Sequence, residues 1–339
     1  MKTKIIEIDG IAEAGEIIRA GGLVAFPTET VYGLGADAMN GAAVKRIFEA
    51  KGRPSDNPLI VHIADKAQIP LLAREISGDA EKLINAFMPG PFTIILKKQA
   101  NIPNEVTAGL DTVGIRFPAE ETAAAFIMAA GTPIAAPSAN ISGRPSPTRA
   151  EDVISDMDGR IEAVINGGSC GVGVESTIVD ASGDAPVLLR PGGVSLEMIR
   201  EIVPSAYADK NIMKTASDDE RPRCPGMKYR HYAPKAQVVV VEGERGAVQD
   251  KIKELLSENT GKVTGVLTMY GNVYDSPVMI CGGSSNKEYA KNLFAALRDF
   301  DKLGAEIIFA EFCEKDGYGA AVKNRLYKAA GYNIIHCEK

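Results

Sequence analysis

The chain has 339 residues, a length that predicts two domains, and its 45% apolar and 24% charged residues are typical of a globular protein. With 38 basic and 44 acidic residues it carries a net charge of −6, which disfavours a general nucleic-acid-binding protein. No apolar run approaches the roughly 20 residues that a membrane helix needs. The five cysteines are widely spaced and form no Cys-x-x-Cys pair, so neither a disulfide framework nor a zinc site is indicated. We therefore expect a reduced, cytoplasmic protein.

The first part of the chain alternates predicted strands and helices in a mixed α/β pattern. Apolar and β-branched runs predict strands at Lys4–Ile8, Leu23–Phe26, Leu59–Ile63, Phe92–Lys97, Val113–Phe117, Pro133–Ala136, Ala163–Asn166 and Ser176–Asp180. Helical spacing of apolar residues predicts helices at Ile11–Ala20, Ala42–Ala50, Asp79–Phe87 and Glu121–Ala130. The segment Thr148 to Glu151 (TRAE) matches a capping box, which predicts one more helix ending near Met157.

The composition changes near residue 205, and this change predicts the domain boundaries. Residues 1–205 hold 18 basic and 26 acidic residues, a net charge of −8, together with 15 of the 19 prolines. We predict a catalytic domain at 1–205, a linker at 206–235 and a second domain at 236–339. The later part of the linker, residues 221–235, carries five basic residues and no acidic one. Its aromatic and basic character favours a lid over a ligand, although a connector packed on the surface remains an alternative.

The last part of the chain is regular. Strands are predicted at Gln237–Glu242, Lys262–Met269, Ala305–Phe312 and Tyr332–His336, and helices at Gly246–Glu258, Glu288–Phe300 and Ala320–Ala330. Strands that alternate with helices favour a parallel sheet with helical crossovers. We expect a small Rossmann-like domain, although it contains no cofactor fingerprint.

Several familiar site types are disfavoured. Residues 33–38 (GLGADA) match the Gly-x-Gly-x-x-Ala dinucleotide pattern, but residues 39–41 separate them from the next predicted helix, which a Rossmann fingerprint should open directly. The chain has no P-loop. It has three histidines, so a Ser-His-Asp hydrolase is improbable. No pair of acidic residues stands beside a histidine at metal-ligand spacing.

Cations and small polar residues gather at the predicted ends of strands and helices. Lys51 and Arg53 flank a glycine after a helix, and Arg116 interrupts an apolar strand, where an unpaired charge is costly. Ser138 and Asn140 follow another strand. Each of these residues alone could be an ion pair, a helix end or a turn. Together, without a nucleophile beside a base, they predict a site for an anionic ligand such as a nucleoside triphosphate.

Motifs in this order resemble the threonylcarbamoyl-AMP synthases of the YrdC type, in their two-domain form. Residues 26–34 (FPTETVYGL) match the opening motif of that family. The residues Lys51 and Arg53, followed by Ser138 and Asn140, match its Lys-x-Arg…Ser-x-Asn signature.

The later motifs extend the resemblance over nearly the whole chain. Residues 224–234 (CPGMKYRHYAP) match the linker signature of the longer members, and residues 324–330 (NRLYKAA) resemble their C-terminal domain. The chain departs from the family at two places. Cys224 stands where serine is usual, and Glu120-Glu121 stands where the family often has His-Pro, which removes a polar neighbour of Arg116.

The resemblance implies an α/β fold. Its N-terminal domain would have a twisted mixed sheet with flanking helices around a concave pocket, and its smaller C-terminal domain would be Rossmann-like. The implied enzyme is a nucleotidyltransferase that joins L-threonine, bicarbonate or carbon dioxide, and ATP into threonylcarbamoyl-adenylate and pyrophosphate. The adenylate would pass to a tRNA threonylcarbamoyl transferase for the t6A37 modification of tRNA.

The resemblance also assigns roles to individual residues. Lys51 and Arg53 would be catalytic, and Arg116 would bind the threonine carboxylate. The other implied threonine contacts are Thr30, His62, Ala136 and Ser176. The implied ATP contacts are Lys51, Arg53, Asn57, Thr112, Ser138, Asn140, Ser146, Arg190 and, from the lid, His231. Mg²⁺ is expected as a cofactor held through the ATP phosphates, without protein side chains as ligands.

Two other functions remain open on sequence grounds. One is a carbamoyl-adenylate-type transferase, which normally adds acylphosphatase-like and zinc-finger parts that this chain lacks. The other is a double-stranded RNA or tRNA-binding module without catalysis. A net charge of −8 in the first part argues against strong RNA binding. A local basic patch could still bind tRNA directly; its candidate residues are Lys51, Arg53, Arg144 and Arg149.

Overall fold

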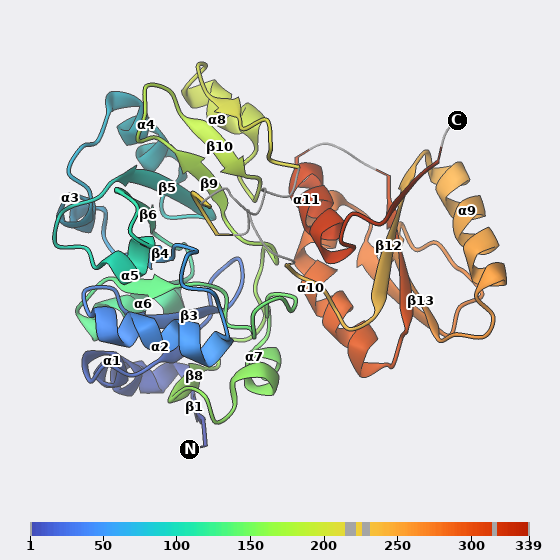
Figure 1. Ribbon diagram of the computed structural model, residues 1–339, viewed down its shortest axis with the longest axis horizontal. Helices are drawn as coiled ribbons and strands as arrows, with labels where there is room; N and C mark the ends of the chain where they lie inside the picture. Colours follow the sequence, from blue (N-terminus) through green and yellow to red (C-terminus); the bar gives the residue numbers. More distant parts are fainter. Residues whose placement is uncertain (1, 214–221, 226–230, 314–316, 338–339) are drawn as a thin grey trace. The chain divides into compact units, whose positions relative to one another are not determined.

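The computed structural model describes residues 2–213, 222–225, 231–313 and 317–337 (Figure 1). Contacts divide the chain into two compact units. The first unit holds residues 1–142 and 146–229, and the second holds residues 143–145 and 230–339. Arg298 of the second unit donates from Nε and Nη2 to the carbonyl oxygen of Pro145, at 3.0 and 2.6 Å, which ties the short segment 143–145 to that unit. No helix in the described part of the chain is long and apolar enough to cross a membrane.

A mixed sheet forms the centre of the first unit. Within the described residues it has eleven strands, which lie in the order β1 (Lys4–Ile6), β8 (Ala163–Ile165), β2 (Val24–Phe26), β3 (Gly33–Asp37), β7 (Ile134–Ala136), β4 (Ile60–His62), β6 (Thr112–Arg116), β5 (Phe92–Lys97), β9 (Thr177–Asp180), β10 (Val187–Arg190) and β11 (Tyr207–Ala208). Parallel and antiparallel pairs alternate irregularly along it; β4 and β6 are parallel, and β4 and β7 are antiparallel.

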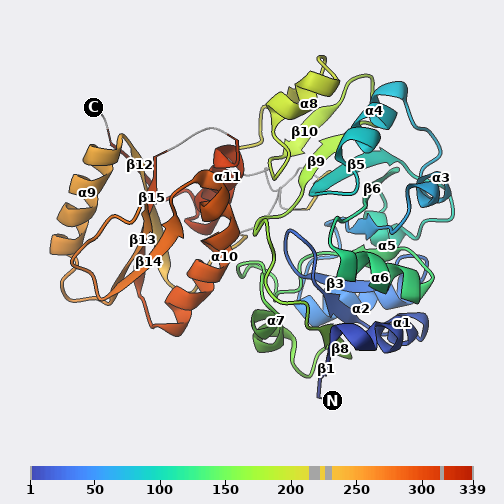
Figure 2. The same ribbon diagram turned by 180° about the vertical axis from the view of Figure 1, so that it is seen from behind.

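Helices flank this sheet, as Figure 2 shows from behind. They are α1 (Ile11–Arg19), α2 (Gly41–Lys51), α3 (Ile69–Leu72), α4 (Gly78–Phe87), α5 (Asn104–Thr107), α6 (Glu121–Ala130), α7 (Ala150–Met157) and α8 (Leu196–Ile202), with two 3₁₀ turns at Ile8–Gly10 and Lys66–Gln68. The helices α1 and α6 pack closely, because Gly15 brings its backbone against that of Ala129. A Cβ at Gly15 would lie 2.5 Å from the Ala129 carbonyl oxygen, so a larger residue there would push the two helices apart.

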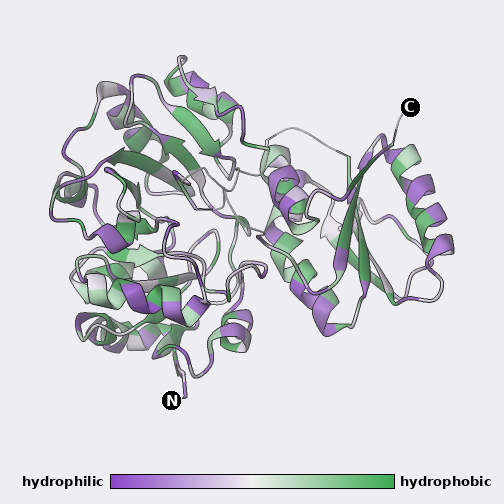
Figure 3. Ribbon diagram, viewed as in Figure 1, coloured by the Kyte–Doolittle hydropathy of each residue, from purple (hydrophilic) through white to green (hydrophobic). Residues whose placement is uncertain are grey.

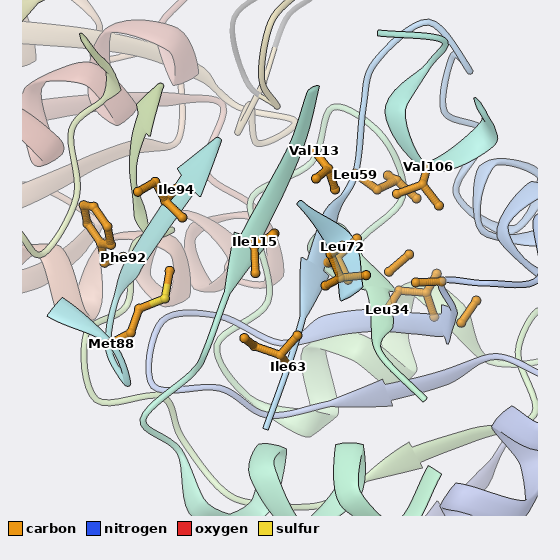
Figure 4. Close-up of a cluster of buried hydrophobic side chains, with 14 of the residues drawn as sticks. Leu34, Leu59, Ile63, Leu72, Met88, Phe92, Ile94, Val106, Val113 and Ile115 are labelled. Carbon is orange, nitrogen blue, oxygen red and sulfur yellow. The ribbon is translucent and has the colours of Figure 1, made fainter. Parts of the chain in front are cut away.

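One face of the central strands is buried in the main core (Figure 4). Ile94 of β5 and both Val113 and Ile115 of β6 point into this core, together with Val61 of β4 and Val179 of β9. Successive residues of a strand point to opposite faces of the sheet. The residues that alternate with these five therefore line the other face.

The second unit contains a parallel sheet. Its strands lie in the order β14 (Val278–Gly283), β13 (Thr264–Met269), β15 (Ile307–Phe312), β12 (Gln237–Gly243) and β16 (Ile334–Cys337). Helix α9 (Arg245–Glu258) covers one face, and α10 (Asn286–Lys302) and α11 (Gly319–Ala329) cover the other (Figures 1 and 2). In Figure 3 the strands β12 and β13 are largely hydrophobic, while α9 carries hydrophilic stretches, as expected for a buried sheet under an exposed helix.

The predicted α/β fold class is confirmed, and β5 and α6 have the predicted bounds. Some local details differ from the predictions. Residues 33–37 form the strand β3, antiparallel to β2, which was not predicted; the glycine pattern there is part of a sheet, which agrees with the disfavoured dinucleotide interpretation. The helix after Thr148 has Arg149 as its N-cap, without a side-chain cap, so the capping box does not form. Tyr207–Ala208 extends the sheet beside β10, within the segment predicted as linker.

Candidate active site

The strand register places several of the predicted site residues on one face of the first unit's sheet. His62 of β4 pairs with Arg116 of β6, and Ile60 pairs with both Gly114 and Ala136. Residues that pair directly share a face, and so do residues two apart on one strand. By this rule Thr112 lies on the same face as Arg116. Arg190 lies on this face as well, because it pairs with Ile178, which in turn pairs with Thr93 of β5. Ser176 shares the face because it is two residues before Ile178.

Arg116 lies at one end of this face, among several polar side chains. Its side chain is 4% exposed, and Nη2 lies 2.8 Å from Oε2 of Glu29 and 3.5 Å from the Thr28 hydroxyl. A buried guanidinium requires such a counter-charge, because its desolvation would otherwise be strongly unfavourable. Nε of Arg116 is also buried and has no hydrogen-bond partner among the described residues. The guanidinium therefore keeps an unused donor beside the ion pair.

His62 lies next to Arg116 and is held neutral. Burial, and then the positive charge of Arg116, lower the pKa of His62 from 6.5 to about 3. Its ring packs edge-on against Phe26 with 5.7 Å between the ring centroids. The Nδ1 atom is buried and has no hydrogen-bond partner within the part of the chain that the structure describes. A neutral imidazole can therefore offer a hydrogen bond to a ligand here without adding charge.

The depressed pKa of His62 predicts how stability depends on pH. The folded pKa, about 3, lies below the ordinary value of 6.5, so the stability linked to the neutral ring is present above pH 6.5 and is lost as pH falls toward 3. Between pH 7 and pH 5 the wild-type chain should lose about 2 kcal/mol more than a His62→Gln variant. Denaturant unfolding of both proteins at the two pH values measures this difference, since other titrating groups are common to both. Parallel losses in the two proteins would show that His62 is not buried in its neutral form.

Hydroxyl groups complete this end of the face. The hydroxyls of Thr28 and Thr30 lie 2.9 Å apart in the loop after β2, and both side chains are buried. The Ser176 hydroxyl lies 2.8 Å from that of Thr93 and accepts a hydrogen bond from Nη2 of Arg190 at 3.1 Å. Arg190 also donates from Nε to the Ser176 carbonyl oxygen at 3.0 Å, so it holds this serine in place.

Lys51 ends α2 and points into the protein. The next residue, Gly52, caps the helix in the left-handed conformation with φ of 60°, a turn that glycine adopts at little cost. The Lys51 side chain is 2% exposed, and its ammonium donates to the carbonyl oxygens of Ser138 and Asn140. The Ser138 hydroxyl donates to Oδ1 of Asn140 at 2.5 Å. The structure thus brings together the two halves of the predicted signature, although they lie far apart in the sequence.

Arg53 and Asn57 lie in the loop that follows α2. Nη2 of Arg53 donates to the carbonyl oxygens of Asn57 and Pro58, both at 3.3 Å. Oδ1 of Asn57 is buried without a hydrogen-bond partner among the described residues. Because an unsatisfied buried oxygen is costly, Asn57 is a good candidate for contact with a ligand. Lys51 and Arg53 contact different carbonyl groups of the first unit.

Pro58 to Ile60 and three strands line a small pocket. Thr112 and Gly114 lie in its wall together with apolar residues of β4, β5 and β9, and residues 223–225 line the pocket as well. Cys224 is buried in an apolar cluster with Ile60, Ile95 and Ile178. An apolar pocket with a few polar groups is typical of ligand sites, but its volume here is about 10 Å³, room for one water molecule, so a nucleobase would fit only if the lining residues move.

Linker residues reach this pocket in the first unit. Arg223 forms ion pairs with Asp180, at 3.5 Å, and with Asp209. Nη1 of Arg190 donates to the Pro225 carbonyl oxygen at 3.4 Å. The rest of the basic linker motif, Arg221 and residues 226–230, lies outside the described residues. His231 belongs to the second unit, where its ring centroid is 5.5 Å from that of Tyr232, and its nucleotide contact stays a prediction.

Two acidic residues of the site were missed by the sequence analysis. Glu175 accepts a hydrogen bond from the Ser146 hydroxyl at 2.5 Å, and Glu29 pairs with Arg116. Both stand inside motifs that drew attention for other reasons, namely residues 26–34 and the segment before β9. A carboxylate in the middle of a mostly apolar motif was the available signal. Cys170 also lies near Glu29 and Arg116, since the charges of both act on its thiol. Burial raises the pKa of that thiol to about 12.

Known proteins resemble both parts of this chain. The family model for Sua5, YciO and YrdC proteins, described as "Telomere recombination", matches residues 16–192. A second model, described as the C-terminal domain of threonylcarbamoyl-AMP synthase, matches residues 194–331. A threonylcarbamoyl-AMP synthase of Pyrococcus abyssi is 51% identical over 324 residues, which cover 95% of this chain and 94% of the relative. That of Bacillus subtilis is 48% identical over 330 residues, covering 96% and 94%.

Solved structures agree with these matches. The crystal structure of P. abyssi Sua5 complexed with L-threonine has a TM-score of 0.95 and 49% identity, and the match covers 99% of this chain and 100% of that one. E. coli YciO, at 24% identity and a TM-score of 0.54 over 58% of this chain, shares the fold. The predicted two-domain resemblance is confirmed. The chain belongs to the Sua5/YciO/YrdC family, and it carries the C-terminal domain of threonylcarbamoyl-AMP synthases after the family domain.

Proposed function

We propose that this chain is a threonylcarbamoyl-AMP synthase. It would form L-threonylcarbamoyl-adenylate and pyrophosphate from L-threonine, bicarbonate or carbon dioxide, and ATP, and would thus act as a nucleotidyltransferase. The observation that carries the proposal is the shared face of the sheet. Arg116 offers a carboxylate site at one end of β6, and Thr112 lies in the apolar pocket at the other end. Relatives with the same name cover nearly the whole chain, which supports the assignment.

The proposed reaction needs positioning and charge more than a protein nucleophile. The threonine amine captures carbon dioxide to give a carbamate, and a carbamate oxygen then attacks the α-phosphorus of ATP. The new O–P bond forms as the bond from the α-phosphorus to the β-bridging oxygen breaks, and pyrophosphate leaves with the electron pair. Negative charge grows on the phosphoryl oxygens and the leaving group. Lys51 and Arg53 would stabilise this charge, with Ser138, Asn140 and Ser146 as further phosphate contacts.

The amino acid would bind beside Arg116. Its carboxylate would accept two parallel hydrogen bonds from the guanidinium, a geometry that arginine provides and lysine does not. Thr30, His62, Ser176 and the backbone at Ala136 would contact its hydroxyl and amine. Since His62 is neutral, it would not compete with Arg116 for the carboxylate.

Mg²⁺ is proposed to accompany ATP. The described residues contain no cluster of three His, Cys, Asp or Glu side chains suited to a metal ion. Mg²⁺ commonly keeps phosphate oxygens and waters as most of its ligands, so this donor set fits an ion carried by the nucleotide. When bound, the ion would neutralise charge on the phosphates.

The pocket beside Thr112 is proposed to hold the nucleoside, with Asn57 and Arg190 at its edge and the linker as its lid. Closing such a site would keep water from the reactive adenylate. The lid would use residues 223–225, which already line the pocket, and His231 from the later part of the linker.

Gly114 offers a test of this pocket. A Cβ at this position would lie 3.5 to 3.8 Å from Thr93, Ile60 and Ile95, which is ordinary van der Waals contact, so the sheet should accept a side chain. Gly114→Val would instead fill pocket space, and we expect ATP affinity to fall about 10- to 200-fold with threonine affinity unchanged. Isothermal titration of each ligand measures this, and Gly114→Ala should give a smaller loss. Unchanged ATP affinity in the valine variant would place the nucleoside elsewhere.

The function itself is tested by incubation with Mg-ATP, L-threonine and labelled bicarbonate. Label should enter an adenylate only when threonine is present, with release of one pyrophosphate for each adenylate. A tRNA threonylcarbamoyl transferase is the proposed acceptor of the product. If no adenylate forms but the protein shifts tRNA at moderate salt, the RNA-binding alternative is favoured. Labelled adenylate from carbamoyl phosphate would favour the carbamoyl-adenylate-type transferase.

A further inference from the structure

Glu29 is a buried carboxylate whose hydrogen-bonding capacity is unused. Both of its oxygens are shielded from solvent, and neither has a hydrogen-bond partner among the described residues. Oε2 lies 2.8 Å from Nη2 of Arg116, but the geometry of that contact is an ion pair and not a hydrogen bond. The Glu29 side chain is 14% exposed, so it lies close to the surface of the site.

A carboxylate in this state is costly for the protein. An ionised carboxylate offers about four lone-pair sites, and burial without hydrogen bonds loses the solvation of each. One ion pair with Arg116 offsets part of this loss. Nε of Arg116 and Nδ1 of His62 are also buried without hydrogen-bond partners in the described part of the chain. Three neighbouring groups with spare donors or acceptors indicate a site that a polar ligand completes.

We propose that Glu29 binds the α-ammonium group of the amino-acid substrate and makes the site specific for a zwitterion. The inference rests on the proposed assignment of the threonine carboxylate to Arg116. A free α-amino acid carries a negative carboxylate and a positive ammonium on one carbon. Arg116 would face the carboxylate of such a ligand, and Glu29 would face its ammonium. A bound zwitterion would therefore replace the one Arg116–Glu29 ion pair by two ion pairs with the ligand.

The dimensions agree with this role. The carboxylate carbon and the nitrogen of an α-amino acid are about 2.5 Å apart, since each is bonded to the same α-carbon. A carboxylate seated on Arg116 therefore places the ammonium within a few ångströms of the guanidinium, which is where Glu29 lies. The loop that carries Glu29 is fixed on both sides. Its carbonyl oxygen accepts a hydrogen bond from the Val172 amide at 2.7 Å, and the next residue, Thr30, accepts one from Gly173 at 3.1 Å.

A purely structural role makes a different prediction. If Glu29 only orients Arg116, its loss should weaken every ligand that binds through a carboxylate by the same factor. If it binds the ammonium, its loss should weaken ligands that have an amine and spare those that lack one. The comparison of L-threonine with 3-hydroxybutyrate, the same molecule without the amine, separates the two roles.

The experiment is a titration of wild-type protein and Glu29→Gln with both ligands, followed by ligand-observed NMR at millimolar concentrations. We expect the variant to bind L-threonine about 10- to 100-fold more weakly and 3-hydroxybutyrate at least as tightly as wild type. Glu120→Gln is the matched control, because Glu120 is another carboxylate that acts on Cys170 but is not the partner of Arg116. It should leave both affinities unchanged.

Three outcomes are decisive. An equal loss for both ligands, or none for threonine, overturns the proposal in favour of a positioning role. If Glu29→Gln unfolds, Glu29→Asp takes its place, because it keeps the negative charge on a shorter side chain. If Glu29→Asp then prefers L-threonine over 3-hydroxybutyrate by at least as much as wild type does, the proposal is overturned. If wild-type protein binds neither ligand, the proposed threonine site itself fails. A wild-type protein that binds threonine and forms adenylate keeps the proposed function, whatever the Glu29 variants do.

Discussion

Lys51→Met is expected to lower the rate of adenylate formation by about 100- to 1,000-fold, the usual cost of removing one preorganised group that stabilises transition-state charge. Methionine fills nearly the same volume as the lysine stem, which matters because the Lys51 side chain is 2% exposed. Single-turnover formation of labelled adenylate at saturating ATP and threonine measures the effect on the chemical step.

The same substitution has a structural cost that must be separated from the catalytic one. The carbonyl oxygens of Ser138 and Asn140 would lose a charged donor, which costs about 1–3 kcal/mol where such groups stay buried. Thermal unfolding of the variant reports this cost. Lys45→Met, on the exposed side of the same helix, is the matched control and should keep full activity. A folded Lys51→Met protein with a rate within tenfold of wild type would remove Lys51 from the catalytic residues.

Arg116→Lys should raise the dissociation constant of L-threonine about 10- to 100-fold while leaving ATP affinity unchanged. Lysine keeps the positive charge opposite Glu29, so the buried ion pair and the fold should survive. It cannot offer two parallel N–H groups to a carboxylate, and this difference is the source of the loss.

Isothermal titration with each substrate measures the Arg116 effect. Arg74→Lys is a suitable control, because Arg74 also pairs with a carboxylate, that of Asp111 at 2.6 Å, but on the exposed surface. It should change neither affinity. Equal threonine binding by Arg116→Lys and wild type would show that the carboxylate lies elsewhere.

The sequence allowed the fold class and most buried strands to be predicted, because apolar runs such as Phe92–Lys97 have few alternatives to a central strand. It failed for β3. The segment Gly33–Asp37 has two glycines, which disfavour a strand locally, yet pairing with β2 and β7 stabilises it there. Tertiary contact outweighed local propensity. A Cβ at Gly35 would lie 2.8 Å from Ile134, so the glycine permits close packing between strands.

The sequence predicted which residue types form the candidate site better than it predicted how those residues are arranged. Lys51 and Arg116 stood out as cations in apolar surroundings, and both are buried at the sheet. Their partners could not be predicted, because they depend on register. Gly52 turns the chain so that Lys51 contacts Ser138 and Arg53 contacts Asn57, and the spacing of the two cations alone does not indicate this. Glu29 was missed although a carboxylate within residues 26–34 was a signal, because its pairing with Arg116 depends on the tertiary structure.

The length of the strand β6 fixes the distance between the two proposed substrate-binding positions. Thr112 and Arg116 are four residues apart on it, so the backbone alone sets a separation of about 13 Å between the ends at which the two substrates are proposed to bind. Loops elsewhere can vary in length without changing that spacing. An insertion of one residue within β6 would turn Arg116 toward the hydrophobic core, and a deletion of two would bring the ends about 7 Å closer. The length of β6 is therefore a fixed dimension of the proposed site.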